Sequence, residues 1–249
     1  MDAPLRVRYR RTRSLPVLSR IRHTWQSPHV VLGPVFWALF RAATQEQRGW
    51  RYPTGPAEVR VAGVDPVRIL VIGDGPAAGC GVLLHEMGIA GTLARHVSVR
   101  IGRGVQVTVS AEPAASARST LDRLDAMDLD PHDVIVLMLA TTDAFCLTPR
   151  RRWIHSMTGL VGRLTADSSA SVLVTSAASM QLTRTLTPFA RRLTGRHARL
   201  LDAETRQICE ATGTPMITLD AANDLTARTY ARWGRRIGAH VVACVRAQG

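Results

Sequence analysis

Short runs of consecutive apolar residues alternate along most of the chain with longer stretches in which apolar side chains recur every three or four positions. Runs of the first kind are typical of strands buried on both faces of a sheet, and stretches of the second kind are typical of helices packed against it. The strands predicted in this way cover residues 67–72, 105–109, 133–139, 171–175 and 215–219. The predicted helices cover residues 83–93, 116–127, 149–164, 188–212 and 225–245.

Five strands that alternate with helices predict an α/β fold, because each parallel strand pair needs a crossover connection. We expect a three-layer αβα sandwich whose five-stranded parallel sheet has the flavodoxin-like strand order. Ligands bind such sheets beyond the carboxyl ends of the strands, beside the first turn. That turn follows the strand at 67–72 and holds glycines at 73, 75, 79 and 81. The sequence therefore places any functional site around residues 73–79.

The first 66 residues differ in composition from the rest of the chain. Residues 1–45 contain a basic arm rich in arginine and the short apolar segment Val30–Phe40, which is shorter than the roughly 20 residues that a membrane-spanning helix needs. This segment either packs on the folded domain or lies at an anionic membrane surface, and the pattern favours neither. Residues 46–66 are rich in proline and glycine and predict a linker, so we expect the folded domain at 67–249.

The positive charge is concentrated near the N-terminus. The formal net charge is +13, and residues 1–60 contribute 11 arginines against 3 acidic residues. Aromatic residues are few and are not interleaved with the basic clusters, which makes nucleic-acid binding unlikely. The four cysteines stand far apart without metal-ligand spacing, as in a cytoplasmic protein with reduced thiols. We expect neither a metal nor a cofactor.

The turn after the first predicted strand, Gly73–Val82, reads Gly-Asp-Gly-Pro-Ala-Ala-Gly-Cys-Gly-Val. This stretch resembles the first motif of the SGNH hydrolases, the GDSL-type lipases and esterases, which runs Gly-Asp-Ser-x-Ala-Ala-Gly-x-Gly-Val. The one departure is Gly75, which occupies the position of the serine nucleophile. The resemblance covers about residues 67–245 and implies the SGNH hydrolase fold. Any activity that it implies is carboxylic ester hydrolysis.

Three further positions of the family's catalytic machinery are also changed. Ala114 falls where a glycine amide helps to bind the oxyanion, although alanine keeps the backbone N–H. Thr142 falls where an asparagine side chain is a second donor, and losing one such donor typically lowers the rate by about 10²–10³. Asp224 falls at the histidine base on a shortened loop, and we interpret it as the N-cap of the last helix. The segment Leu147–Trp153 matches the opening of the family's next helix and fixes this register.

The hydroxyl groups of Ser116, Thr141 and Thr142 lie near the expected mouth of the site, but none has an obvious histidine base. Cys146 is a candidate for a relocated nucleophile, although a lone cysteine without a base is more often structural. The candidate pocket comprises Asp74, Gly75, Ala114, Ser116, Thr141, Thr142, Asp143 and Cys146.

The resemblance and the four changed positions together predict a catalytically inactive pseudo-esterase. Such a protein acts as a binding or scaffold module for an unidentified small molecule or protein. The alternative is a weak or rewired ester hydrolase that uses non-standard residues. A different hypothesis treats Gly73–Gly79 as a dinucleotide-binding loop with Glu112 at the ribose. The register of the later motifs and the unusual Pro76 favour the hydrolase-like interpretation.

Overall fold

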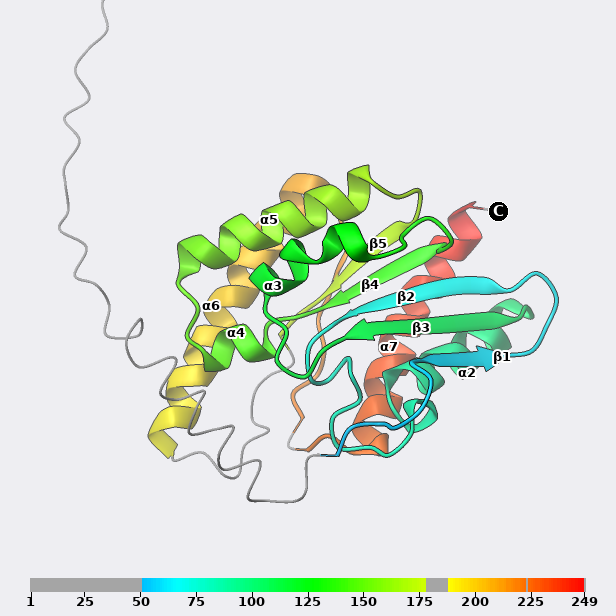
Figure 1. The fold of residues 1–249 in the computed structure, drawn as a ribbon, viewed down its shortest axis with the longest axis horizontal. Helices are drawn as coiled ribbons and strands as arrows, with labels where there is room; N and C mark the ends of the chain where they lie inside the picture. Colours follow the sequence, from blue (N-terminus) through cyan, green and yellow to red (C-terminus); the bar gives the residue numbers. More distant parts are fainter. Residues whose placement is uncertain (1–50, 178–187, 223, 249) are drawn as a thin grey trace, which may run out of the picture.

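A computed structural model describes residues 51–177, 188–222 and 224–248 of the chain (Figure 1). The predicted basic arm and apolar segment at 1–45 lie outside the described residues, as does the start of the predicted linker.

One mixed sheet of six strands forms the centre of the described structure, in the order β1-β3-β2-β4-β5-β6. The strands are β1 (Glu58–Val61), β2 (Val67–Gly73), β3 (Val105–Ala111), β4 (Val134–Met138), β5 (Ser171–Thr175) and β6 (Met216–Ile217). The strands from β2 to β6 are all parallel, and their order along the sheet is the flavodoxin-like order predicted from the sequence. The α/β class and this order are therefore confirmed.

The predicted number of strands, five, is wrong because residues 58–61 form an additional edge strand. This strand, β1, pairs antiparallel with β3, with Val59 opposite Val107. Its residues alternate between polar and apolar, so that Val59 is buried and Arg60 is exposed. Such alternation is typical of a strand with one covered face. It is only four residues long here and lies among the prolines and glycines that predicted a linker.

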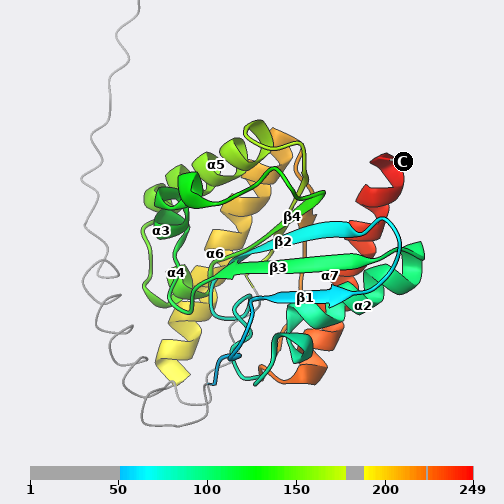
Figure 2. The ribbon, with the colours of Figure 1, turned by 45° about the vertical axis from the view of Figure 1, so that its right-hand side comes forward.

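Helices cover both faces of the sheet, as the two views in Figures 1 and 2 show. One layer holds α2 and α7, and the other holds α3, α5 and α6, which gives the predicted three-layer sandwich. The α-helices are α2 (Ile89–Ile101), α3 (Ala117–Asp122), α4 (Thr141–Phe145), α5 (Arg150–Ala166), α6 (Pro188–Thr212) and α7 (Ala227–Gln248). Short 3₁₀ turns are η1 (His85–Met87) and η2 (Leu124–Ala126). In the part of the chain that the structure describes, no helix is both long and apolar enough to cross a membrane.

The central strands are apolar on both faces because helices cover both of them. Every residue of β4 is buried, and so is every residue of β2 except Arg68. Strand β3, nearer the edge, buries alternate residues such as Val107 and leaves Gln106 and Thr108 partly exposed.

The helix predicted for residues 83–93 begins later than expected and extends further, since α2 covers Ile89–Ile101. Leu83, Leu84 and Met87 lie within the predicted range but outside α2, and their side chains are about half exposed. Gly81 explains the difference, because its φ of 90° lies in the left-handed region and its amide donates to the carbonyl of Arg51. The chain therefore continues from the glycine turn as a loop and a 3₁₀ turn before α2.

Helices α2 and α7 pack closely because two glycines of α7 face α2. A Cβ atom on Gly234 would lie 2.8 Å from the Cβ of Thr92, and one on Gly238 would lie 2.7 Å from Cδ2 of His96. At the start of α7 the Tyr230 hydroxyl donates to the carbonyl of Cys80 at 2.6 Å. This contact joins the last helix to the glycine turn after β2.

Candidate functional site

Three loops meet beyond the carboxyl ends of the adjacent strands β3, β2 and β4. In the sheet register, Gly73 at the end of β2 lies between Ala111 of β3 and Met138 of β4. The amide of Asp74 donates to the carbonyl of Met138, and the amide of Glu112 donates to the carbonyl of Gly73, both at 3.2 Å. The structure thus brings together the loops that the sequence singled out.

Asp74 lies at the centre of these loops and is almost completely buried. Its Oδ2 accepts the backbone N–H groups of Thr141 at 2.7 Å and Thr142 at 3.2 Å. Its Oδ1 is enclosed and has no hydrogen-bond partner among the residues described. Burial raises the pKa of Asp74 from its ordinary 3.8 to about 7, although the two amide bonds act in the opposite direction. Ala140, with a φ of 105°, turns the chain so that both amides begin α4 beside Asp74.

Gly75 has room for a side chain. A Cβ atom built there would meet only the carbonyl of Pro113 and the hydroxyl of Tyr52, each at 3.5 Å, which is ordinary van der Waals contact. At Gly73, by contrast, a Cβ would lie 2.2 Å from the carbonyl oxygen of Met138. Packing therefore requires glycine at 73 and does not require it at 75.

Tyr52 is a member of this site that the sequence analysis missed. Its hydroxyl stands near Gly75 and forms a hydrogen bond with the Cys80 thiol. Burial raises the pKa of Cys80 to about 12 and the pKa of Tyr52 above its ordinary value of 10. Both groups therefore remain protonated at neutral pH, and neither supplies a base or a thiolate. Tyr52 lies outside any recognisable sequence motif. It enters the site because residues 51–54 run beside the glycine turn.

Thr142 and Asp143 belong to α4 and are buried. The Thr142 hydroxyl has no hydrogen-bond partner within the described part of the chain. Asp143 accepts the amide of Ala117 at 2.8 Å and the hydroxyl of Thr148 at 2.7 Å, and burial raises its pKa. Asp143 thereby joins the start of α3 to the turn between α4 and α5.

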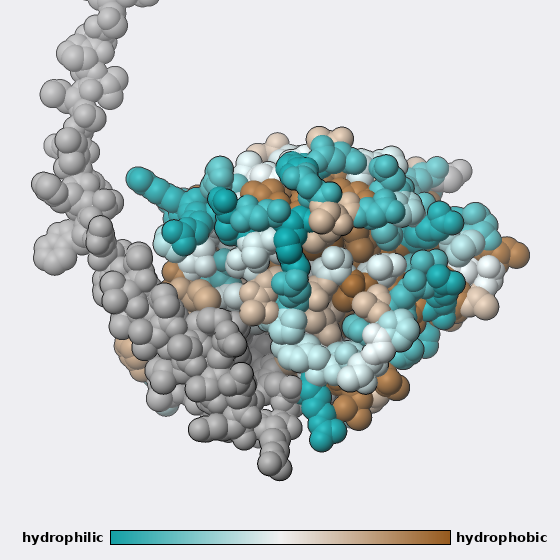
Figure 3. All heavy atoms as spheres, viewed as in Figure 1, coloured by the Kyte–Doolittle hydropathy of each residue, from teal (hydrophilic) through white to brown (hydrophobic). Residues whose placement is uncertain are grey.

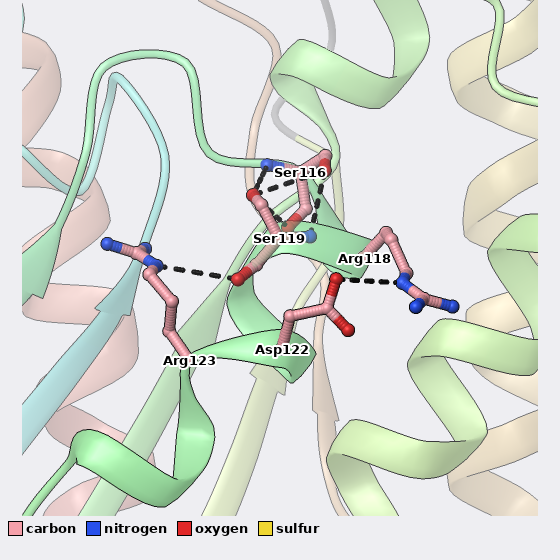
Figure 4. A network of polar contacts seen from close by, with 5 residues as sticks. All are labelled: Ser116, Arg118, Ser119, Asp122 and Arg123. Atoms are coloured by element: carbon pink, nitrogen blue, oxygen red, sulfur yellow. Dashed lines mark hydrogen bonds and ion pairs between the residues drawn. The ribbon is translucent and has the colours of Figure 1, made fainter.

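Ser116 caps α3 through a reciprocal pair of bonds with Ser119 (Figure 4). The Ser116 Oγ accepts the Ser119 amide at 3.1 Å, and the Ser119 Oγ accepts the Ser116 amide at 2.9 Å. This capping box occupies the Ser116 hydroxyl. Ala114, two residues earlier, is exposed at the tip of the same loop and offers only backbone groups.

Asp224 lies just before α7 and is exposed. Its Oδ1 accepts the hydroxyl of Thr229 at 2.8 Å and that of Thr226 at 3.2 Å, both at the start of the helix. Next to it, the carbonyl oxygen of Leu225 lies against Gly81, where an added Cβ would approach it to 2.3 Å. The sequence predicted Asp224 as the N-cap of this helix. Because α7 begins at Ala227, Thr226 holds the N-cap position and Asp224 lies two residues before it.

His197 is the second residue that the sequence analysis did not place near the site. It projects from α6 toward the turn between α4 and α5, where its Nε2 lies 2.8 Å from the carbonyl oxygen of Thr148. A carbonyl only accepts hydrogen bonds, so this ring nitrogen carries the proton and donates it. Nε2 is consequently not available as a base toward Gly75.

A cavity of about 450 Å³ opens between these elements, and we refer to it as the α3–α4–α5 cavity. Its walls are formed by Ser116, Arg118, Asp143, Cys146, Thr148 and Arg152. Burial, together with the charge of Asp143, raises the pKa of the Cys146 thiol to about 11, which disfavours the thiolate. Within the described ranges no three histidine, cysteine or acidic side chains come together as a metal site.

A larger hollow of about 710 Å³ lies away from the three loops, along β2 and β3. It is lined by Arg68, Gln106, Thr108 and His132 among others, and His132 precedes β4 at the amino end of that strand. We assign the candidate site to the smaller cavity because it contains three residues of the predicted pocket.

Comparison with known proteins identifies the fold. No protein-family model matches the sequence, and no curated protein matches it. A carbohydrate acetylesterase from Sinorhizobium meliloti matches with a TM-score of 0.57 at 16% identity, over 71% of this chain and 99% of that one. An aryl esterase from M. smegmatis matches with a TM-score of 0.58 at 14% identity, over 72% and 99% of the two chains.

A lipase/acylhydrolase from Enterococcus faecalis matches with a TM-score of 0.57 at 15% identity, over 71% of this chain and 96% of that one. This chain has the SGNH hydrolase fold. The predicted fold is therefore confirmed, whereas sequence identities this low carry no information on the chemistry.

The SGNH hydrolase fold also weighs against a dinucleotide-binding loop. Such a loop leads directly into a helix whose N-terminus faces the phosphates. Here α2 begins at Ile89, well beyond Gly79. Glu112, the residue considered for the ribose, forms an ion pair with Arg123.

Proposed function

We propose that this protein is a catalytically inactive pseudo-esterase of the SGNH hydrolase fold that acts as a binding or scaffold module. The observation that carries the proposal is Gly75, at the position of the nucleophile, where the nearest side-chain atom to a built Cβ is the protonated Tyr52 hydroxyl. Acyl transfer needs an attacking group, a base and donors aimed at the oxyanion.

The side chains considered for the missing chemistry are already engaged in structural contacts. Asp224 accepts hydroxyls at the start of α7, Ser116 caps α3, and Nε2 of His197 donates to a backbone carbonyl. The Thr142 hydroxyl, in place of an asparagine amide, offers one donor on a shorter side chain. This arrangement supports retention of the fold without its hydrolytic chemistry.

The alternative proposal is a weak or rewired ester hydrolase, and the position of Cys146 in the wall of the α3–α4–α5 cavity favours it. Its raised pKa makes Cys146 a poor nucleophile unless a bound substrate changes its surroundings. We further propose a cytoplasmic location. We also propose that residues 1–45 contact anionic membrane peripherally. Flotation with anionic vesicles tests this contact.

Hydrolysis of a short-chain chromogenic ester tests the inactive state. We expect the purified wild type to match a heat-killed control, and Gly75→Ser to gain little, because its hydroxyl would have no base. Gly75→Ala is the matched control, since both variants add a Cβ that the structure accommodates. The double variant Gly75→Ser/Asp224→His is also expected to gain little ester hydrolysis if the shortened loop holds the imidazole away from the serine.

Two outcomes would contradict the inactive state. Wild-type turnover that Cys146→Ala abolishes would establish a relocated thiol nucleophile. Turnover that survives both Cys146→Ala and Thr142→Val would mean that the family positions are assigned to the wrong residues. Native mass spectrometry of the purified chain would show separately whether a small molecule remains bound.

A further inference from the structure

We propose that the α3–α4–α5 cavity binds a small dissolved molecule through a phosphate or carboxylate group, and that Arg118 and Arg152 hold this group. The inference rests on the proposed binding function and names the chemical class of its ligand. The cavity volume of about 450 Å³ falls within the range of about 300–1,000 Å³ usual for small-molecule sites.

Apart from the Cys146 thiol, the polar groups that line the cavity divide into two sets. The first set already uses its hydrogen bonds within the protein. Both oxygens of Asp143 accept bonds, the Thr148 hydroxyl is the donor to one of them, and the Ser116 hydroxyl is part of the α3 capping box. The side chains of these three residues therefore have few hydrogen-bonding atoms free for a ligand.

The second set consists of the two arginines, which reach the cavity from different helices. Arg118 is on α3 and its Nε donates to Asp122 at 2.8 Å (Figure 4), an exposed pair that engages only this nitrogen. Arg152 is on α5 and forms no ion pair with any residue that the structure describes. Guanidinium groups have no acceptor atom, so the ligand that suits them must supply acceptors.

Arginine also matches the geometry of an anion. Its planar fork of N–H donors forms paired hydrogen bonds with phosphate or carboxylate oxygens. Hydrophilic side chains gather over α3 and α5 on the face shown in Figure 3, so a charged ligand would approach over polar surface.

The position of Arg152 adds an energetic reason. It lies in the first turn of α5, which has three consecutive arginines and no acidic residue. Positive charge is unfavourable there, because the helix dipole places its own positive end at the N-terminus. Arg150 is compensated by the buried carboxylate of Glu204, whereas Arg152 has no such partner in the described structure. A bound anion would remove this repulsion.

Phosphate binding by the full-length chain tests the proposal. Thermal unfolding is followed with inorganic phosphate, and with sodium chloride at equal ionic strength, and calorimetric titration gives the Kd. We expect phosphate at ten times its Kd to raise Tm by about 3–5 °C above the chloride control. Arg152→Gln and Arg118→Gln should each weaken phosphate binding about tenfold or more, as expected for loss of a charge-assisted hydrogen bond.

Arg151→Gln is the matched control, because it removes the same charge from the same turn of α5 outside the cavity wall. It should change the Kd by no more than about twofold, since exposed charges are screened by salt. Equal weakening by Arg151→Gln and Arg152→Gln would mean that only the general surface charge attracts phosphate, and would overturn the proposal. A phosphate effect no larger than that of chloride would also overturn it.

A lipid headgroup would present the same chemistry, so vesicles of phosphatidic acid form a second arm. Binding of these vesicles that depends on Arg152, without binding of dissolved phosphate, would mean that the ligand is a lipid and that the proposal is wrong. These readouts are independent of ester hydrolysis. The ligand class and the inactive state can therefore fail separately.

Discussion

Replacing Asp74 by asparagine should remove a large pH dependence from the stability of this protein. The Asp74 side chain is 1% exposed, and burial raises its pKa from 3.8 to about 7. Because the folded pKa lies above the unfolded one, the folded protein holds this proton more tightly. The resulting stability is fully present below about pH 4 and is lost as the pH rises through about 7. At 1.36 kcal/mol per pKa unit, the loss amounts to about 4 kcal/mol.

Asparagine is the informative replacement because it keeps the shape of the side chain and cannot titrate. Its Oδ1 can still accept the amides of Thr141 and Thr142 that now donate to the carboxylate. The free energy of unfolding would be measured by urea denaturation between about pH 4 and pH 8 for both proteins. The difference between the two curves isolates Asp74, because the other titrating groups are present in each protein.

Asp202→Asn serves as a control for this experiment. Burial raises the pKa of Asp202 to about 6, so this variant should remove a smaller part of the pH dependence and at lower pH. If wild type and Asp74→Asn lose stability in parallel as the pH rises, the buried carboxyl has the same proton affinity folded and unfolded. That result would refute the reasoning.

The remaining predictions concern packing and the boundary of the domain, and each is checked by denaturation. Gly91→Ala should destabilise by about 1–3 kcal/mol, because a Cβ there would lie 2.1 Å from a backbone carbonyl oxygen of η1. A Cβ at Gly162 would meet no atom within 4 Å, so Gly162→Ala should instead stabilise the protein by about 0.5–1 kcal/mol. If both variants changed the free energy of unfolding in the same direction, the packing argument would be contradicted. Tyr230→Phe should lose about 1–2 kcal/mol with its buried hydrogen bond to Cys80, and an unchanged midpoint would contradict this. A chain that begins at Arg51 should unfold cooperatively near the wild-type melting temperature, whereas a chain that also lacks β1 should melt at a lower temperature. A low melting temperature for the chain that begins at Arg51 would show that residues 1–50 belong to the folding unit.

The strength of the local pattern decided which strands the sequence could predict. β4 lies in the middle of the sheet, so both of its faces are buried and its five residues are all apolar. β1 is covered on one face, and its four residues alternate between two polar and two apolar side chains. A pattern that short is not distinctive, and pairing with β3 rather than local propensity makes it a strand.

The sequence predicted those parts of the candidate site that lie at the ends of strands or in motifs that resemble those of the SGNH hydrolases. Asp74 and Thr142 lie in turns that follow adjacent strands, so the sheet order alone brings them together. Tyr52 enters the site because residues 51–54 run beside the glycine turn, where the Arg51 carbonyl accepts the amide of Gly81. His197 was placed on a helix correctly, but the rotation of α6 that points it at Thr148 is set by packing. Contacts of this kind join distant segments, and no local pattern records them.

The close packing of α7 on α2 also sets the time at which the domain can finish folding on the ribosome. α7 follows every other described element in the sequence, and its Trp233, Ile237 and Val241 are completely buried against the rest of the domain. Until α7 has emerged from the exit tunnel, the face of the sheet that it covers lacks half of its helical layer. The nascent chain therefore exposes apolar strand surface until α7 has emerged, and surface of this kind promotes aggregation.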